Sequence, residues 1–179
     1  MRKEFAQLLH AEMIINPDIF LITGDLGYGL WDRIRDDHPK RFYNVGSSEM
    51  AMMGTAIGLA MEGKIPYVYS ITPFAIYRPF EMIRNYLDHE NIPVNIIGGG
   101  RDREYGYLGF SHWSHDDKRI MSVFNNIKSF HPDDIGSLDI ALSYSLTKKQ
   151  PTYINLGDRV SVEIEGIGRL ENIVVARYS

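Results

Sequence analysis

Apolar side chains recur at helical spacing through the first fifteen residues of the chain. They are Phe5, Leu8, Leu9 and Met13. All four fall on one side of a helix over residues 2–15, and Pro17 ends the pattern. The apolar run 19–23 that follows has the length and composition of a buried strand. The chain is therefore expected to open with a helix that packs on a strand.

Beyond residue 23, short apolar runs alternate with longer amphipathic stretches. The pattern predicts further strands at 42–45, 66–71, 93–97, 127–130 and 152–156. It predicts helices at 48–62, 74–89, 116–123 and 133–148. Such alternation is typical of an α/β fold with a mainly parallel sheet and helices on both faces. Two further apolar runs, 160–164 and 173–176, are separated by glycines and predict a C-terminal hairpin.

Length and composition narrow the possible functions. The 179 residues suit one domain, which we expect over 1–157, with 158–179 as a C-terminal extension. The net charge is −4 and no Lys/Arg cluster occurs, so we expect no nucleic-acid partner. There are no cysteines for disulfides or thiolate chemistry. The first residues lack the apolar core of a signal peptide, and the apolar stretch 50–61 is too short to cross a bilayer. We therefore expect a cytoplasmic location and no membrane partner.

One carboxylate, Glu49, stands at the start of an otherwise apolar helix of small residues. A serine of the preceding Gly-Ser-Ser segment can cap this helix, and an acidic residue is favoured in its first turn. A simple helix-start role is therefore one interpretation of Glu49. Gly54 and Gly58 leave one side of the helix nearly bare, which permits close approach by another backbone.

Residues 41–50, Arg-Phe-Tyr-Asn-Val-Gly-Ser-Ser-Glu-Met, suggest a second interpretation. They resemble the R-F-x-x-V-G-I-x-E-x-x-M segment in the pyrimidine-binding domain of transketolase-like thiamine diphosphate enzymes. Ser47 stands where that family usually has Ile. The likeness covers about residues 20–157. The further matching segments are 65–70, 74–77 with Arg84, 106–112 and 131–134.

The resemblance implies a role for each matching residue. Glu49 would be catalytic, because the family's glutamate hydrogen-bonds the N1′ nitrogen of the cofactor's aminopyrimidine. Phe74 would stack on the pyrimidine ring, and Tyr77 would lie close to its amino group. His112 would be a second catalytic residue near the reacting substrate. Phe110 replaces a proline that is usual in this family, which leaves the identity of the substrate open.

Plainer interpretations remain for several of these residues. Phe74 and Tyr77 could simply pack in the core, since aromatic residues at helical spacing often do. Arg84 could be a solvated charge or part of an interface ion pair. Asp25 matches a family Asp-Leu pair and could equally be a turn residue. The run 112–116 contains two histidines and a carboxylate, and a metal site is an alternative interpretation of it. We nevertheless expect no metal ligands in this chain.

In the resembled family the cofactor lies between two domains. The second domain holds the diphosphate through a divalent cation, with a G-D-G segment followed by Asn. No G-D-G segment occurs here. The resemblance thus implies a split enzyme that uses thiamine diphosphate, with Mg²⁺ or another divalent cation held by a partner subunit. We expect a heterotetramer of the two subunits that transfers a two-carbon ketol unit from a sugar. The alternatives are a subunit of a 2-oxo acid decarboxylase or dehydrogenase, and a non-catalytic interaction subunit of the same fold.

Overall fold

The computed structural model describes residues 1–157, 160–164 and 168–172. Six strands of this part of the chain form one sheet in the order β2-β1-β3-β4-β6-β5, and every neighbouring pair is parallel. The strands are β1 Ile19–Thr23, β2 Phe42–Asn44, β3 Ile65–Ile71, β4 Asn95–Gly99, β5 Lys128–Phe130 and β6 Thr152–Leu156. The predicted α/β fold with a parallel sheet is confirmed.

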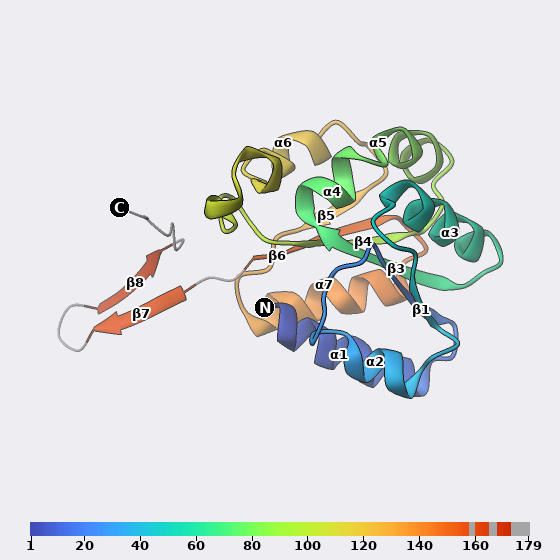
Figure 1. The fold of residues 1–179 in the computed structure, drawn as a ribbon, viewed down its shortest axis with the longest axis horizontal. Helices are drawn as coiled ribbons and strands as arrows, with labels where there is room; N and C mark the ends of the chain where they lie inside the picture. Colours follow the sequence, from blue (N-terminus) through green and yellow to red (C-terminus); the bar gives the residue numbers. More distant parts are fainter. Residues whose placement is uncertain (158–159, 165–167, 173–179) are drawn as a thin grey trace.

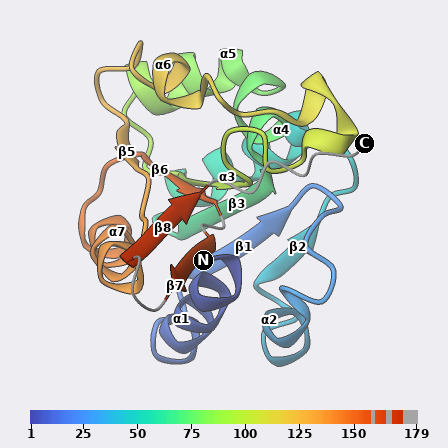
Figure 2. The same cartoon turned by 90° about the vertical axis from the view of Figure 1, so that its left-hand side faces the viewer.

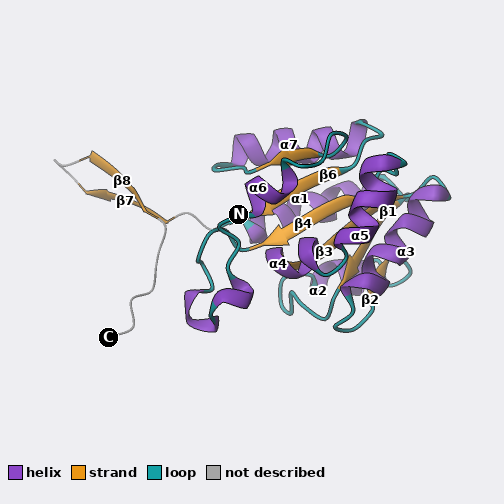
Figure 3. Cartoon of the chain, turned by 90° about the horizontal axis from the view of Figure 1, so that it is seen from above, coloured by secondary structure: helices purple, strands orange, loops and turns teal. Residues whose placement is uncertain are grey.

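Helices cover both faces of this sheet (Figures 1 and 2). One face carries α1 Arg2–Ile15, α2 Asp32–Asp37 and α7 Ile135–Thr147. The other carries α3 Glu49–Met61, α4 Thr72–Tyr77, α5 Phe80–Met82 and α6 Asp117–Met121, which lie in front of the strands in Figure 3. None of the helices among the described residues is long and apolar enough to cross a bilayer.

Strand side chains alternate between these two layers, as pleated backbone requires. Val68 and Ile96 are fully buried beneath α3 and α4, whereas Tyr67 and Ile97, their neighbours in the chain, are buried on the α1 and α7 side. Each strand of the sheet centre is therefore buried on both faces, which is why its sequence is mostly apolar rather than alternating between apolar and polar residues.

The prediction of a single helix over residues 74–89 is wrong. The chain forms α4, then α5, then a π-helical segment η1 over Ile83–His89. Pro79 lies between α4 and α5, where it has no N–H to donate to a continuing helix. The break leaves the last turn of α4 at the carboxyl edge of the sheet. The short helix α2 was not predicted, because its Asp-rich six residues show no apolar period.

The remaining elements predicted within residues 1–157 differ from the structure only at their ends. Strand β4 begins and ends two residues later than the predicted 93–97. Among the C-terminal residues, β7 Val160–Ile164 pairs antiparallel with β8 Gly168–Asn172, so the second strand precedes the predicted 173–176. Residues 173–176 lie outside the described part of the chain. The domain division after residue 157 stays a prediction.

The sheet places its functional edge where β1, β3 and β4 end. Because parallel strands all point the same way, the segments after Thr23, Ile71 and Gly99 leave the sheet at one edge. Open α/β sheets bind their ligands at this carboxyl edge. The long segment 100–116 also starts here and contains two short 3-10 helices, η2 Gly106–Leu108 and η3 Phe110–His112.

Candidate functional site

Glu49 begins α3 at the carboxyl edge of the sheet. Gly46, with φ of +74°, lets the chain turn between β2 and this helix in a conformation that other residues rarely adopt. Ser48 caps the helix by accepting a hydrogen bond from the Ala51 N–H at 3.4 Å. Although it lies in the first turn, Glu49 is only 3% exposed. A helix-start acid has no need of burial, so this carboxylate lies where a specific partner is required.

Two side chains satisfy the Glu49 carboxylate. The Ser70 hydroxyl, on β3, donates to Oε1 at 3.1 Å. The Arg78 guanidinium, just past the end of α4, donates through Nη1 to Oε2 at 2.7 Å. The side chain of Glu49 is 2% exposed whereas that of Arg78 is 47% exposed, so the ion pair joins a buried anion to a half-solvated cation.

Phe74 and His112 complete this arrangement. Phe74 lies in the first turns of α4, and the Arg78 guanidinium carbon stands 3.8 Å from the centre of its ring. His112, at the end of η3, meets the same ring edge-on with centroids 4.9 Å apart. We call Glu49, Ser70, Phe74, Arg78 and His112 the Glu49 cluster. Three of the four predicted site residues are thus brought together.

Tyr77 is directed elsewhere. Its hydroxyl donates to Asp116 Oδ1 at 2.5 Å, and the residue is 36% exposed. Burial and the neighbouring Asp116 carboxylate both raise the pKa of this hydroxyl. The contact ties α4 to the segment that carries His112. A role of Tyr77 toward a cofactor amino group stays a prediction.

The other candidates of the sequence have ordinary surroundings. Arg84 lies on the surface and donates to Asn85 Oδ1 at 2.8 Å. Asp25 has a positive φ of 59° and exchanges hydrogen bonds with Asn44, as expected of a turn residue. Within residues 1–157, 160–164 and 168–172, no three His, Cys, Asp or Glu side chains are grouped so as to hold a metal ion.

Beneath the cluster, a buried polar network connects α6 to the sheet. Asp117 is 3% exposed, and its Oδ2 accepts from the Tyr153 hydroxyl at 2.7 Å, from Asn155 Nδ2 at 2.8 Å and from His131 Nε2 at 3.1 Å. Burial alone would raise the pKa of Asp117. The hydrogen bonds from His131, Tyr153 and the Lys118 backbone outweigh it and hold the pKa below its ordinary value.

The glycines at the end of β4 serve this packing rather than a phosphate. A Cβ on Gly98 would lie 2.5 Å from Thr72 Oγ1, and one on Gly99 would lie 2.7 Å from the Tyr69 hydroxyl. Thr72 in turn donates to the Gly100 carbonyl at 2.7 Å. Gly98 lets the start of α4 approach β4 closely, which sets the position of Phe74 within that helix, whereas Gly99 makes room for Tyr69 on the opposite face of the sheet.

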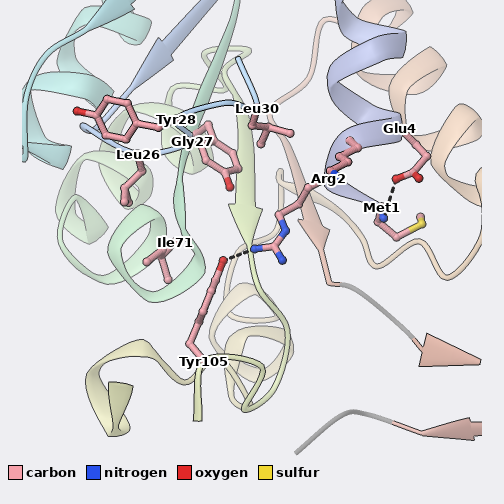
Figure 4. A pocket seen from close by; sticks show the side chains of 11 residues that line it. Met1, Arg2, Glu4, Leu26, Gly27, Tyr28, Leu30, Ile71 and Tyr105 are labelled. Carbon is pink, nitrogen blue, oxygen red and sulfur yellow. Dashed lines mark hydrogen bonds and ion pairs between the residues drawn. The ribbon is translucent and has the colours of Figure 1, made fainter. Parts of the chain in front are cut away.

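A cavity of about 620 Å³ lies between the start of α1, the loop after β1, the end of β3 and Tyr105 (Figure 4). β3 supplies Tyr69 and Ile71 to its lining, and the loop after β1 supplies Leu26, Gly27 and Tyr28. Arg2, from the start of α1, crosses the cavity to hydrogen-bond the Tyr105 hydroxyl and pairs with Glu104 at 2.7 Å. Cationic and phenolic groups thus line this cavity, whose lining residues are distinct from those of the Glu49 cluster.

The sequence interpretation missed Arg78, Ser70 and the Asp117 network. The sequence does contain signals for Ser70 and Arg78. Ser70 interrupts an apolar strand at its carboxyl end, and Arg78 precedes a proline that ends a helix. The link between Asp117 and Tyr153 spans 36 positions, and no local pattern predicts it.

Comparisons with known proteins agree with this geometry. Residues 1–159 match the family described as the transketolase pyrimidine binding domain. An apulose-4-phosphate transketolase subunit from Actinobacillus succinogenes is 32% identical over 128 residues, which are 72% of this chain and 41% of that protein. A putative transketolase C-terminal section from Methanocaldococcus jannaschii is 32% identical over 69% of this chain and 39% of its own length.

Among solved structures, a split-gene transketolase described as an inactive beta4 tetramer matches with a TM-score of 0.76 and 29% identity. The match covers 87% of this chain and 50% of that one. This chain therefore spans half or less of the length of these relatives. The family match over most of the chain and the buried Glu49 beside Phe74 at the carboxyl edge agree: the chain belongs to the transketolase pyrimidine-binding domain family.

Proposed function

We propose that this chain binds the aminopyrimidine half of thiamine diphosphate and supplies its activating carboxylate, Glu49, in a split transketolase-like enzyme. The observation that carries the proposal is a carboxylate only 3% exposed near a half-buried aromatic ring, Phe74, at the carboxyl edge of a parallel sheet. An N–H donor on a flat ring would satisfy both groups at once. The site therefore fits an aminopyrimidine.

Ser70, Phe74 and His112 each have a distinct part in this proposal. Ser70 keeps Oε1 occupied, which leaves Oε2 to exchange a proton with the pyrimidine N1′ atom. Phe74 offers its ring face for stacking, and His112 brings an imidazole to the same ring. When bound, thiamine diphosphate supplies a carbanion at its thiazolium ring, while the protein provides orientation and electrostatics.

The reaction and the partner are part of the same proposal. Relatives are named as a transketolase subunit and a transketolase C-terminal section, and a similar structure is of a split-gene transketolase. We infer that a partner subunit holds the diphosphate through Mg²⁺ and that the two subunits assemble as a heterotetramer. The reaction would be transfer of a two-carbon ketol unit.

Glu49→Gln tests this function in the complex reconstituted with the partner. Glutamine has nearly the same shape and can still hydrogen-bond, but it cannot share a proton with N1′. Removal of a positioned proton-transfer group costs about a hundred- to ten-thousand-fold in rate. We expect exchange of the thiazolium proton, followed by NMR, to slow by that factor while the cofactor still binds.

Glu62→Gln is the matched control, since Glu62 is an exposed acid just past the other end of α3. It should exchange the proton at the unaltered rate. If Glu49→Gln also exchanged the proton as fast as the unaltered complex, Glu49 would have no part in activating the cofactor and the proposal would fail.

A further inference from the structure

Arg78 makes the two contacts that the proposed function assigns to the aminopyrimidine. Its Nη1 donates to Glu49 Oε2 at 2.7 Å, and its guanidinium carbon lies 3.8 Å from the centre of the Phe74 ring. This inference rests on the proposed function, because it concerns what occupies the same two groups before a cofactor does.

The chemistry of a guanidinium explains how it can take this position. It is planar and delocalised, it presents N–H donors in its own plane, and it stacks on aromatic faces. An aminopyrimidine is also flat, and its N1′ atom presents an N–H to a carboxylate once it carries the proton that it shares with Glu49. The Glu49 carboxylate and the Phe74 ring face can therefore hold either the guanidinium or the aminopyrimidine, but not both at the same time.

Burial explains why Glu49 needs such a partner. A carboxylate whose side chain is 2% exposed is costly to leave unpaired, and Ser70 satisfies only Oε1. Arg78 supplies the counter-charge to Oε2. Because 47% of the Arg78 side chain is exposed, its own charge stays partly solvated and can return to water at modest cost.

We propose that Arg78 is a displaceable placeholder for the aminopyrimidine. In the chain without cofactor it holds Glu49 in position and covers Phe74, and it leaves both when the ring enters. Its location suits this exchange, since Arg78 is the residue between the end of α4 and Pro79, where the helix is interrupted. Arg78 is in this proposal a positioning residue, which acts through Glu49.

The exchange has a measurable consequence for affinity. When a site is open in only a fraction of the molecules, its apparent affinity is the intrinsic affinity multiplied by that fraction. Without Arg78 the aminopyrimidine would meet an uncovered ring and an unpaired carboxylate. Loss of this arginine should therefore strengthen cofactor binding while weakening the fold of the cofactor-free chain.

The first experiment is thermal unfolding of the full chain without cofactor. Arg78→Met should lower the unfolding midpoint by more than Arg35→Met, the matched control. Arg35 is 48% exposed and pairs with Asp32 and Asp36, whose side chains are themselves about half or more exposed. In a Glu49→Gln background, Arg78→Met should have little further effect. An equal loss in both backgrounds would mean that Arg78 does not act through Glu49, and would overturn the proposal.

The second experiment is calorimetry of thiamine diphosphate with Mg²⁺ on the complex reconstituted with the partner. Arg78→Met should tighten binding by about threefold or more, as expected if the covered state predominates in the unaltered chain. Unchanged affinity would overturn the placeholder role. Weaker binding would also overturn it and would identify Arg78 as a contact of the bound cofactor.

A second variant and the binding of the unaltered complex keep these outcomes distinct. If Arg78→Met does not fold, Arg78→Gln retains one N–H donor for Glu49 without the charge, and it should also bind cofactor more tightly than the unaltered complex. If the unaltered complex bound no thiamine diphosphate, the proposed function itself would fail, and this inference with it. If it bound and only the Arg78 variants departed from expectation, the proposed function would stand.

Discussion

The hydroxyl of Tyr153 provides a direct test of the buried network that supports the site. It donates to Asp117 Oδ2 at 2.7 Å, and Tyr153 is fully buried. Tyr153→Phe would remove this donor and leave the ring packing intact. A hydrogen bond to a charged group contributes about 1.5–3 kcal/mol, so the free energy of unfolding should fall by about that amount. For a domain of this size the unfolding midpoint should fall by about 4–8 °C for each 2 kcal/mol.

Tyr67→Phe is the matched control on the opposite face of the sheet. Tyr67 is also fully buried, and its hydroxyl shares a hydrogen bond of 2.7 Å with the neutral Ser145 hydroxyl. A neutral hydrogen bond contributes about 0.5–1.5 kcal/mol. Urea unfolding of both variants at neutral pH should therefore show a larger loss for Tyr153→Phe than for Tyr67→Phe.

Acidity separates the two variants further. The pKa of Asp117 is held below its ordinary value of 3.8 in the folded chain. Its charged form therefore stabilises the fold above that value, and this contribution is lost as the pH falls through the folded pKa. The cost of Tyr153→Phe should shrink over that range, while the cost of Tyr67→Phe stays constant. Equal losses at neutral pH, or a Tyr153→Phe loss that does not change with acidity, would refute the reasoning.

Two further substitutions, Gly98→Ala with Gly106→Ala as its control and Arg101→Lys, test how the carboxyl edge is held. Gly98→Ala would bring a Cβ to 2.5 Å from Thr72 Oγ1, and overpacking of this kind costs about 1–3 kcal/mol. Gly106→Ala, with nothing within 4 Å of its Cβ, should be close to neutral in the same urea titration. Arg101→Lys should cost about 2–4 kcal/mol, because lysine cannot replace the guanidinium bonds to Asp133, Asn155 and the Pro132 carbonyl. A loss below that of one neutral hydrogen bond would show that these contacts contribute little.

The local elements of this protein followed from its sequence because their causes are local. The helix over residues 2–15 shows its apolar face at spacing 3 and 4, and the strand at 19–23 shows its burial as an unbroken apolar run. The match of residues 41–50 to a known segment likewise selected Glu49. Pro79 also acts locally, and a helix across it should not have been expected.

Tertiary structure decided the order of the strands and the partners of Glu49. Strand β6 lies between β4 and β5, and local periodicity carries no information on which strands become neighbours. Arg78 and Ser70 reach Glu49 across 29 and 21 positions because β3 and α4 end at the edge where α3 begins. A buried carboxylate must find its counter-charge in space rather than along the chain. The sequence alone therefore singled out Glu49 as a candidate, while only the folded chain showed which groups surround it.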